Sequence, residues 1–173
     1  MDTADASRAA GANAMKPAPI IGIDPGPREF AWVLWDGSRV LDCGDVPNYR
    51  PGAFLTPSVG YRVAVEWVES FGMAVGREVF ETVFSIGRMA AMKDVRLVPR
   101  RDVKLHICRS PRAKDGNIRQ ALIDRFGPVG TKKNPGPLAG ISNHRWAALA
   151  VAVTAFDLEQ TDHEATFHRM TGT

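Results

Sequence analysis

The stretch Ile20-Ile21-Gly22-Ile23-Asp24-Pro25-Gly26 decides the fold of this chain. Four apolar or glycine positions lead directly to one acid, and a proline and a glycine follow it. A continuous apolar run that ends in a turn is typical of a strand buried on both faces. Asp24 would then lie at the end of that strand, where open α/β sheets bind their ligands. A carboxylate in such apolar surroundings is unfavourable unless it is paired or binds a metal ion, so Asp24 is the first candidate functional residue.

A second strand later in the chain follows the same pattern. Tyr61-Arg62-Val63-Ala64-Val65-Glu66 is again mostly apolar and again ends in a carboxylate. If the two strands are neighbours, Asp24 and Glu66 lie at the same sheet edge, where Mg²⁺ typically takes one or two protein carboxylates together with substrate phosphate oxygens. Two such ions about 4 Å apart stabilise the attacking and leaving oxygens when a phosphodiester is cleaved. The alternative is that Glu66 is an ordinary strand-end acid and Asp24 caps a turn at Pro25-Gly26.

The rest of the chain alternates strands with helices. Asp36-Gly37 is a strong hairpin turn, so three strands begin the fold and at least two of them are antiparallel. The predicted elements after the first strand are strands at about 30–35, 39–44 and 61–66, a helix at 77–92, a strand at 95–98, a helix from Asp115 to about Arg125, and a last helix capped by Ser142 or Asn143. This order predicts an α/β protein with a mixed five-stranded sheet flanked by α-helices, which is the order of a ribonuclease-H-like fold.

The whole-chain numbers describe an ordinary folded protein. Of its 173 residues 45% are hydrophobic and 24% charged, with a net charge of +3, which suits one domain and permits an anionic partner without requiring one. Residues 1–17 predict a disordered leader, 18–160 the folded domain and 161–173 a flexible tail. Cys43 and Cys108 form no CxxC pair, so a cytoplasmic location is expected. No apolar run approaches the roughly 20 residues of a membrane helix.

Two further residues could complete a metal site. His144 is predicted in the first turn of the last helix, where it could ligate a metal ion, help to orient water, or be a solvated residue of the capping region. Asp115 begins another predicted helix and could be its N-cap or a metal ligand. Phe71 and Met73 lie on the small-residue loop after Glu66 and are either core residues or a wedge against a base or junction.

Basic residues gather in one third of the chain. Only three acids lie among them, namely Asp102, Asp115 and Asp124. Such clustering is typical of contacts to a phosphate backbone, which position DNA without reading its sequence, although a solvated charged face is the alternative. The candidate DNA-binding residues are Arg100, Arg101, Lys104, Arg109, Arg112, Lys114, Lys132 and Lys133, with Arg119 on the helix between them.

Several of these motifs, taken in order, resemble one known family. Gly22-Ile23-Asp24-Pro25-Gly26 and Val63-Ala64-Val65-Glu66 resemble the two acidic strands of the RuvC family of Holliday junction resolvases. The basic segment from Val103 to Lys114, with the helix that follows it, is similar to the same region of that family. The loop 132–138 and the start of the last helix, 144–150, resemble a phage and prophage branch of it. The resemblance covers roughly residues 19 to 156.

The resemblance implies a ribonuclease-H-like nuclease domain over 18–160, often dimeric, that cuts four-way or other branched DNA with Mg²⁺ or Mn²⁺. Asp24 and Glu66 match the family's first two metal-binding acids, and Lys104 and Lys114 look like its DNA-contacting or catalytic lysines. The departures lie in the last helix. His144 stands where the family usually has Asp, although some members have His.

A second departure follows one turn later in the same helix. Ala147 stands where the family commonly has a further Asp, so the site holds fewer carboxylates than is usual. Asp115 could compensate only if its helix starts near Asp24.

Three hypotheses follow for the function. The first is a metal-dependent, structure-selective endodeoxyribonuclease in which water attacks a phosphodiester between two metal ions held by Asp24, Glu66 and His144, and Lys114 neutralises charge near the scissile phosphate. The second is a protein of the same fold that binds branched DNA with weakened or lost catalysis, which the departures at His144 and Ala147 motivate. The third, an actin-like phosphotransferase, needs roughly double the length and a second phosphate-binding glycine turn, and this chain has neither.

Overall fold

The computed structural model describes residues 17–50, 60–70, 72 and 74–171, with side chains as far as residue 162. Nearly all of the predicted leader lies outside the described residues, as do Phe71, Met73 and the middle of the loop before the second acidic strand. The elements are β1 (Ile20–Pro25), β2 (Glu29–Trp35), β3 (Val40–Pro47), β4 (Arg62–Trp67), α1 (Arg77–Met92), β5 (Arg96–Pro99), α2 (Arg100–Cys108), α3 (Asp115–Phe126) and α4 (Arg145–Thr171).

The strands form one mixed sheet in the order β3-β2-β1-β4-β5, which confirms the predicted sheet. β1 pairs antiparallel with β2, and β2 with β3, whereas β1–β4 and β4–β5 are parallel. The hairpin between β2 and β3 turns at Asp36-Gly37, where Gly37 has a φ of +95° that favours glycine. Oδ1 of Asp36 accepts a hydrogen bond from the N–H of Ser38 at 2.9 Å, which closes the turn.

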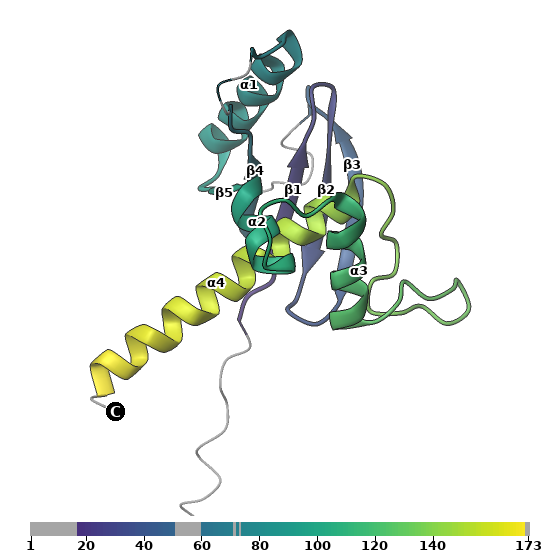
Figure 1. The fold of residues 1–173 in the computed structure, drawn as a ribbon, viewed down its shortest axis with the longest axis vertical. Helices are drawn as coiled ribbons and strands as arrows, with labels where there is room; N and C mark the ends of the chain where they lie inside the picture. The colour runs from purple at the N-terminus through teal and green to yellow at the C-terminus, as the bar shows by residue number, and fades with distance from the viewer. Residues whose placement is uncertain (1–16, 51–59, 71, 73, 172–173) are drawn as a thin grey trace, which may run out of the picture.

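Helices cover both faces of the sheet, and each face has its own apolar cluster. Alternate residues of β1 point to opposite faces, so Ile20 packs with α2, α3 and α4, while Ile21 and Ile23 pack with Ile86 and Met89 of α1. α4 crosses the sheet and continues beyond it (Figure 1). Asp24 has the same strand parity as Ile20, and therefore lies on the α4 face.

Gly22 allows α4 to lie directly on β1. A Cβ atom at this position would be 2.2 Å from the carbonyl oxygen of Ala148 and 2.6 Å from the Cβ of Ala152, which is closer than atoms can approach. Ala148 and Ala152 are fully buried and small, so the backbones of the helix and the strand come close together. This contact fixes the start of α4 relative to Asp24, two residues along β1.

α1 forms over its predicted range, and two of its large aromatic side chains are exposed. Phe80 and Phe84 are 64% and 68% exposed. The side of α1 that faces the sheet instead carries Thr82 and Ser85, besides Ile86 and Met89. These two hydroxyl groups donate to backbone carbonyls one turn earlier, at 2.8 and 3.0 Å, so they can be buried without loss of hydrogen bonding.

Two helices differ from the sequence prediction. The basic segment after Pro99 begins with α2, where no element is predicted from sequence, and Val103 anchors this helix in the core. The predicted tail from 161 continues α4 as far as Thr171. No glycine or proline interrupts 160–171, so nothing in the sequence ends the helix there. No helix within the described ranges has the length and apolar character that a bilayer crossing requires.

Candidate functional site

The two strand-end acids come together as the sequence predicts. Ile23 of β1 and Val65 of β4 are partners in the parallel register, so Asp24 and Glu66 follow side by side at the carboxyl ends of adjacent strands. Both side chains are largely buried, with exposures of 16% for Asp24 and 8% for Glu66. Both point to the α4 face because they share strand parity with the residues that pack there.

Burial and mutual repulsion act on this carboxylate pair. Burial, then the charge of Glu66 and a hydrogen bond between the two carboxyl groups, raise the pKa of Asp24 to about 7, against a smaller lowering by His144 and Arg100. Two buried carboxyl groups in contact need either a shared proton or a cation between them. The pair is therefore suited to bind a positively charged ligand.

His144 approaches Asp24 from the start of α4. Its Nδ1 lies 3.3 Å from Oδ2 of Asp24, and its side chain is 81% exposed. The backbone carbonyl of His144 accepts the N–H of Ala148 at 3.2 Å, so the residue is the N-cap of α4, one position before the predicted first turn. Asn143 precedes it with a φ of +45°, a conformation that asparagine tolerates.

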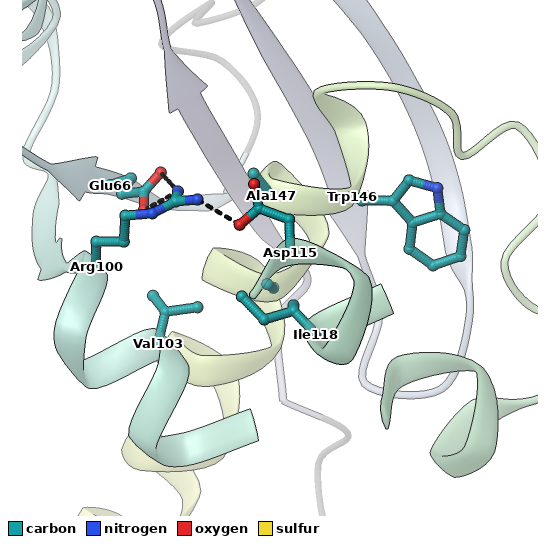
Figure 2. A pocket seen from close by; sticks show the side chains of 8 residues that line it. Glu66, Arg100, Val103, Asp115, Ile118, Trp146 and Ala147 are labelled. Atoms are coloured by element: carbon teal, nitrogen blue, oxygen red, sulfur yellow. Dashed lines mark hydrogen bonds and ion pairs between the residues drawn. The ribbon is translucent and has the colours of Figure 1, made fainter. Parts of the chain in front are cut away.

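Arg100, predicted from sequence as a DNA-binding residue, is also a member of this site. Its Nη1 donates to Oε1 and Oε2 of Glu66 at 2.7 and 3.1 Å, and its Nη2 donates to Oδ1 of Asp115 at 2.6 Å, as the dashed lines in Figure 2 show. Arg100 follows β5, the parallel neighbour of β4, which is why its side chain arrives beside Glu66. The contact between Arg100 and Glu66 depends on the sheet order, which the sequence does not show directly. The basic character of the segment indicated DNA binding instead.

Asp115 lies at this site and does not cap α3, contrary to the first of its two predicted roles. Lys114 is the N-cap, and its N–H donates to Oδ1 of Asn117 at 2.9 Å. Asp115 is the first helical residue, and its carboxylate pairs with Arg100. The start of α3 thus brings a third carboxylate to the group of acids at the sheet edge.

Two open hollows meet at Asp24 and His144. One of about 650 Å³ is lined by Asp24, Arg100, Asp115, Asn143, His144, Trp146 and Ala147. The other, of about 400 Å³, is lined by Asp24, Pro25, Gly26, Pro27, Arg28, Glu29, Ala31, Asp45 and His144. A small cavity of about 30 Å³ lies between Glu66, Arg100 and Ala147 (Figure 2). It has room for little more than water. The acids are therefore accessible from a wide, partly charged surface.

The donors present fit a divalent cation in a loosely built site. Among residues with described side chains, no three His, Cys, Asp or Glu groups converge as a ready-made metal cage. Mg²⁺ does not need one, since it commonly takes one or two carboxylates and completes its shell with water and substrate oxygens. The facing carboxyl groups of Asp24 and Glu66 supply that chemistry, and the imidazole of His144 stands next to them.

The other predicted DNA-binding residues lie on the helical side of the sheet that carries α4. They occupy α2, the turn into α3, and the loop between α3 and α4, which projects past α3 (Figure 1). Lys104 is half-buried, whereas the remaining six are exposed: Arg101, Arg109, Arg112, Lys114, Lys132 and Lys133.

The sheet order and its helical layers define a ribonuclease-H-like α/β fold. Among solved structures, RuvC from Thermus thermophilus superposes on 83% of this chain and 96% of its own length, with a TM-score of 0.57 and 18% identity. T. thermophilus RuvC in complex with a Holliday junction substrate matches 80% of this chain and 92% of its own, with the same TM-score of 0.57 and 18% identity. The fold is RuvC-like. No protein-family model and no curated protein sequence matches the chain.

Proposed function

We propose that this protein is a metal-dependent, structure-selective endodeoxyribonuclease that cleaves Holliday junctions or other branched DNA. The observation that carries the proposal is the buried pair of Asp24 and Glu66, which faces an open, charged surface from the ends of adjacent parallel strands. The RuvC-like fold supports the choice of substrate, since one structure of that fold holds a Holliday junction. The earlier expectation of a phage or prophage branch stays a prediction.

Each residue of the site has a role in this proposal. Asp24 and Glu66 hold Mg²⁺ or Mn²⁺, with His144 as a further ligand or as the group that orients the Asp24 carboxylate. A bound divalent ion would activate water and stabilise the oxygens of phosphodiester cleavage. Lys114, exposed beside Asp115, neutralises charge at the scissile phosphate. The exposed basic residues hold the DNA backbone without reading its sequence.

We further propose that the protein acts in the cytoplasm as a homodimer, with α1 at the contact between copies. Resolving a four-way junction takes two nicks at symmetric positions, which a two-fold pair of active sites supplies. Phe80 and Phe84 form an exposed aromatic pair on α1, one helical turn apart. A second copy would present the same apolar surface, so each copy covers that of the other.

The decisive test is nicking of a synthetic four-way junction in Mg²⁺ or Mn²⁺, with a flap and a linear duplex as comparisons. Wild-type protein should nick the branched substrates and spare the duplex. Asp24→Asn should abolish nicking while binding is retained, because the change removes a ligand charge and keeps the shape of the side chain. Asp124→Asn removes an exposed carboxylate on α3 and should cut normally. Cleavage by Asp24→Asn would show that the site is wrongly assigned.

A second candidate function is binding of branched DNA without cleavage. It is favoured by the pairing of Arg100 with Glu66 and by Ala147, which gives the site no carboxylate from α4. This function predicts tight, junction-selective binding by the wild-type protein and no nicks at any Mg²⁺ or Mn²⁺ concentration. The same nicking assay therefore separates the two functions.

A further inference from the structure

The guanidinium of Arg100 lies between two acids of the site. It forms three short hydrogen bonds, two to the carboxylate of Glu66 at 2.7 and 3.1 Å and one to Asp115 at 2.6 Å. Charge-assisted hydrogen bonds of this kind are the strong ones. The Glu66 side chain is only 8% exposed, so its carboxylate has lost most of its water and depends on such a partner. The chain itself thus supplies one cation to the group of acids.

Regular secondary structure holds Arg100 in place. Val98 and Pro99 of β5 are in register with Glu66 and Trp67 of β4. Arg100 follows immediately as the first residue of α2. Its backbone is therefore fixed by a strand on one side and a helix on the other. A guanidinium also keeps its charge at every working pH, so a metal ion would have to displace a tethered and permanent competitor.

The contacts among the acids leave the pair of Asp24 and Glu66 for an external cation. Glu66 contacts Asp24 on one side and Arg100 on the other, and Arg100 in turn contacts Asp115. The charges of three carboxylates are balanced by one guanidinium and one divalent ion. With Arg100 removed, the buried carboxylate of Glu66 would lose its cation and, together with the exposed Asp115, would offer oxygen ligands to a second ion.

We propose that Arg100 takes the place of one divalent cation, so that the site binds a single ion, held by Asp24 and Glu66. The inference rests on the proposed nuclease function, because it concerns the ion that this function requires. Arg100 also lines the larger hollow with His144 and Asp115. Its guanidinium is therefore placed to balance charge on a bound phosphate group.

The test counts Mn²⁺ ions bound per chain by electron paramagnetic resonance, on the full-length protein without DNA. Wild-type protein should bind one ion. Arg100→Gln should bind two, because Glu66 and Asp115 then lose their shared cation. Arg101→Gln removes the same charge from the neighbouring exposed position on α2 and should still bind one ion.

A wild-type count other than one, or an Arg100→Gln count that stays at one in a folded protein, overturns the inference. Should Arg100→Gln fail to fold by circular dichroism, the wild-type count still decides, together with Arg100→Lys, which keeps the charge and should bind one ion. The count needs neither DNA nor turnover. A protein that binds one ion and cuts nothing would contradict the nuclease proposal while supporting this role for Arg100.

Discussion

The carboxyl group of Asp24 is held where its ionisation weakens the fold. Its pKa in the folded protein is about 7, against 3.8 for an ordinary Asp. The folded state therefore holds this proton more tightly than the unfolded state. The resulting stability is present below about pH 4 and is lost as the pH rises through 7. A cation bound at Asp24 would restore it.

Asp24→Asn should accordingly stabilise the metal-free protein while it removes the proposed activity. We expect the free energy of unfolding at pH 8, in the presence of a chelator, to rise by up to about 4 kcal/mol, since each unit of pKa corresponds to about 1.4 kcal/mol. Urea denaturation followed by circular dichroism measures the change. Asp124→Asn, at an exposed position, should stay within about 0.5 kcal/mol of wild type. A destabilised Asp24→Asn would contradict this account.

The residues of the site were predictable from sequence to different degrees. Asp24 and Glu66 follow from pattern alone, because each ends an apolar strand and parallel neighbours end at the same edge. Asp115 was a candidate from its place at a helix start, but its pairing with Arg100 did not follow from sequence, since their meeting depends on β5 lying beside β4 and on the path from α2 to α3. Local pattern identifies what a residue does in its own element, but not which distant residue it will contact.

Among the elements, α4 depends on one glycine of the strand beneath it. Gly22→Ala would place a methyl group within 2.2 Å of the backbone oxygen of Ala148, so helix and strand must separate. We expect a loss on the order of 3 kcal/mol in the free energy of unfolding, and a loss of nicking because His144 moves away from Asp24. Thermal denaturation and the junction assay measure the two effects.

A matched control for that substitution lies in α1. Gly87 is exposed there, and no atom outside its own helical turn lies within 4 Å of the position of its Cβ. Gly87→Ala should therefore raise stability by about 0.4–1 kcal/mol, through helix propensity and reduced freedom of the unfolded chain. Equal effects of the two glycine substitutions would show that close packing of α4 is not what Gly22 provides.

Asp157 of α4 joins three helices. Nε2 of His106 on α2 lies 2.7 Å from its Oδ2, and Arg125 on α3 donates to both of its oxygens at 2.6 and 3.0 Å. Burial raises the pKa of Asp157, but the hydrogen bonds from His106 and Arg125 outweigh it and lower the pKa below 3.8. The stability that this carboxylate contributes is therefore present above about pH 4 and is lost as the pH falls further.

Asp157→Asn should lower the free energy of unfolding near neutral pH by about 1–3 kcal/mol, because a charged acceptor is lost from two partners. The difference from wild type should shrink as the pH falls below 4, where the wild-type carboxylate is also protonated. Urea midpoints between pH 3 and pH 7 measure it. A deficit that stays constant over this range would mean that Asp157 acts through packing and not through its charge.

At the scale of the whole molecule, the sequence predicted the arrangement of the strands better than it predicted which side chains of the helices are exposed. The alternation of strands with helices along the chain and the turn at Asp36-Gly37 indicate a mixed sheet. Its five strands form as expected. The sequence located α1 but did not show which side of the helix faces the core. Thr82 and Ser85 pack inward and Phe80 and Phe84 outward, because hydroxyl groups bonded to their own helix are acceptable in the core.

The exposed aromatic pair on α1 gives the last prediction, which concerns assembly. Phe84→Glu should convert the proposed dimer to a monomer, because a carboxylate at the centre of a two-fold contact meets its own copy. Light scattering after size-exclusion chromatography measures the mass. Ala90→Glu adds the same charge at another exposed position of α1 and should leave the dimer intact. In the junction assay, the Phe84→Glu monomer should give single nicks where the wild type gives paired ones. A wild-type protein that is monomeric both alone and on a junction would contradict the dimer.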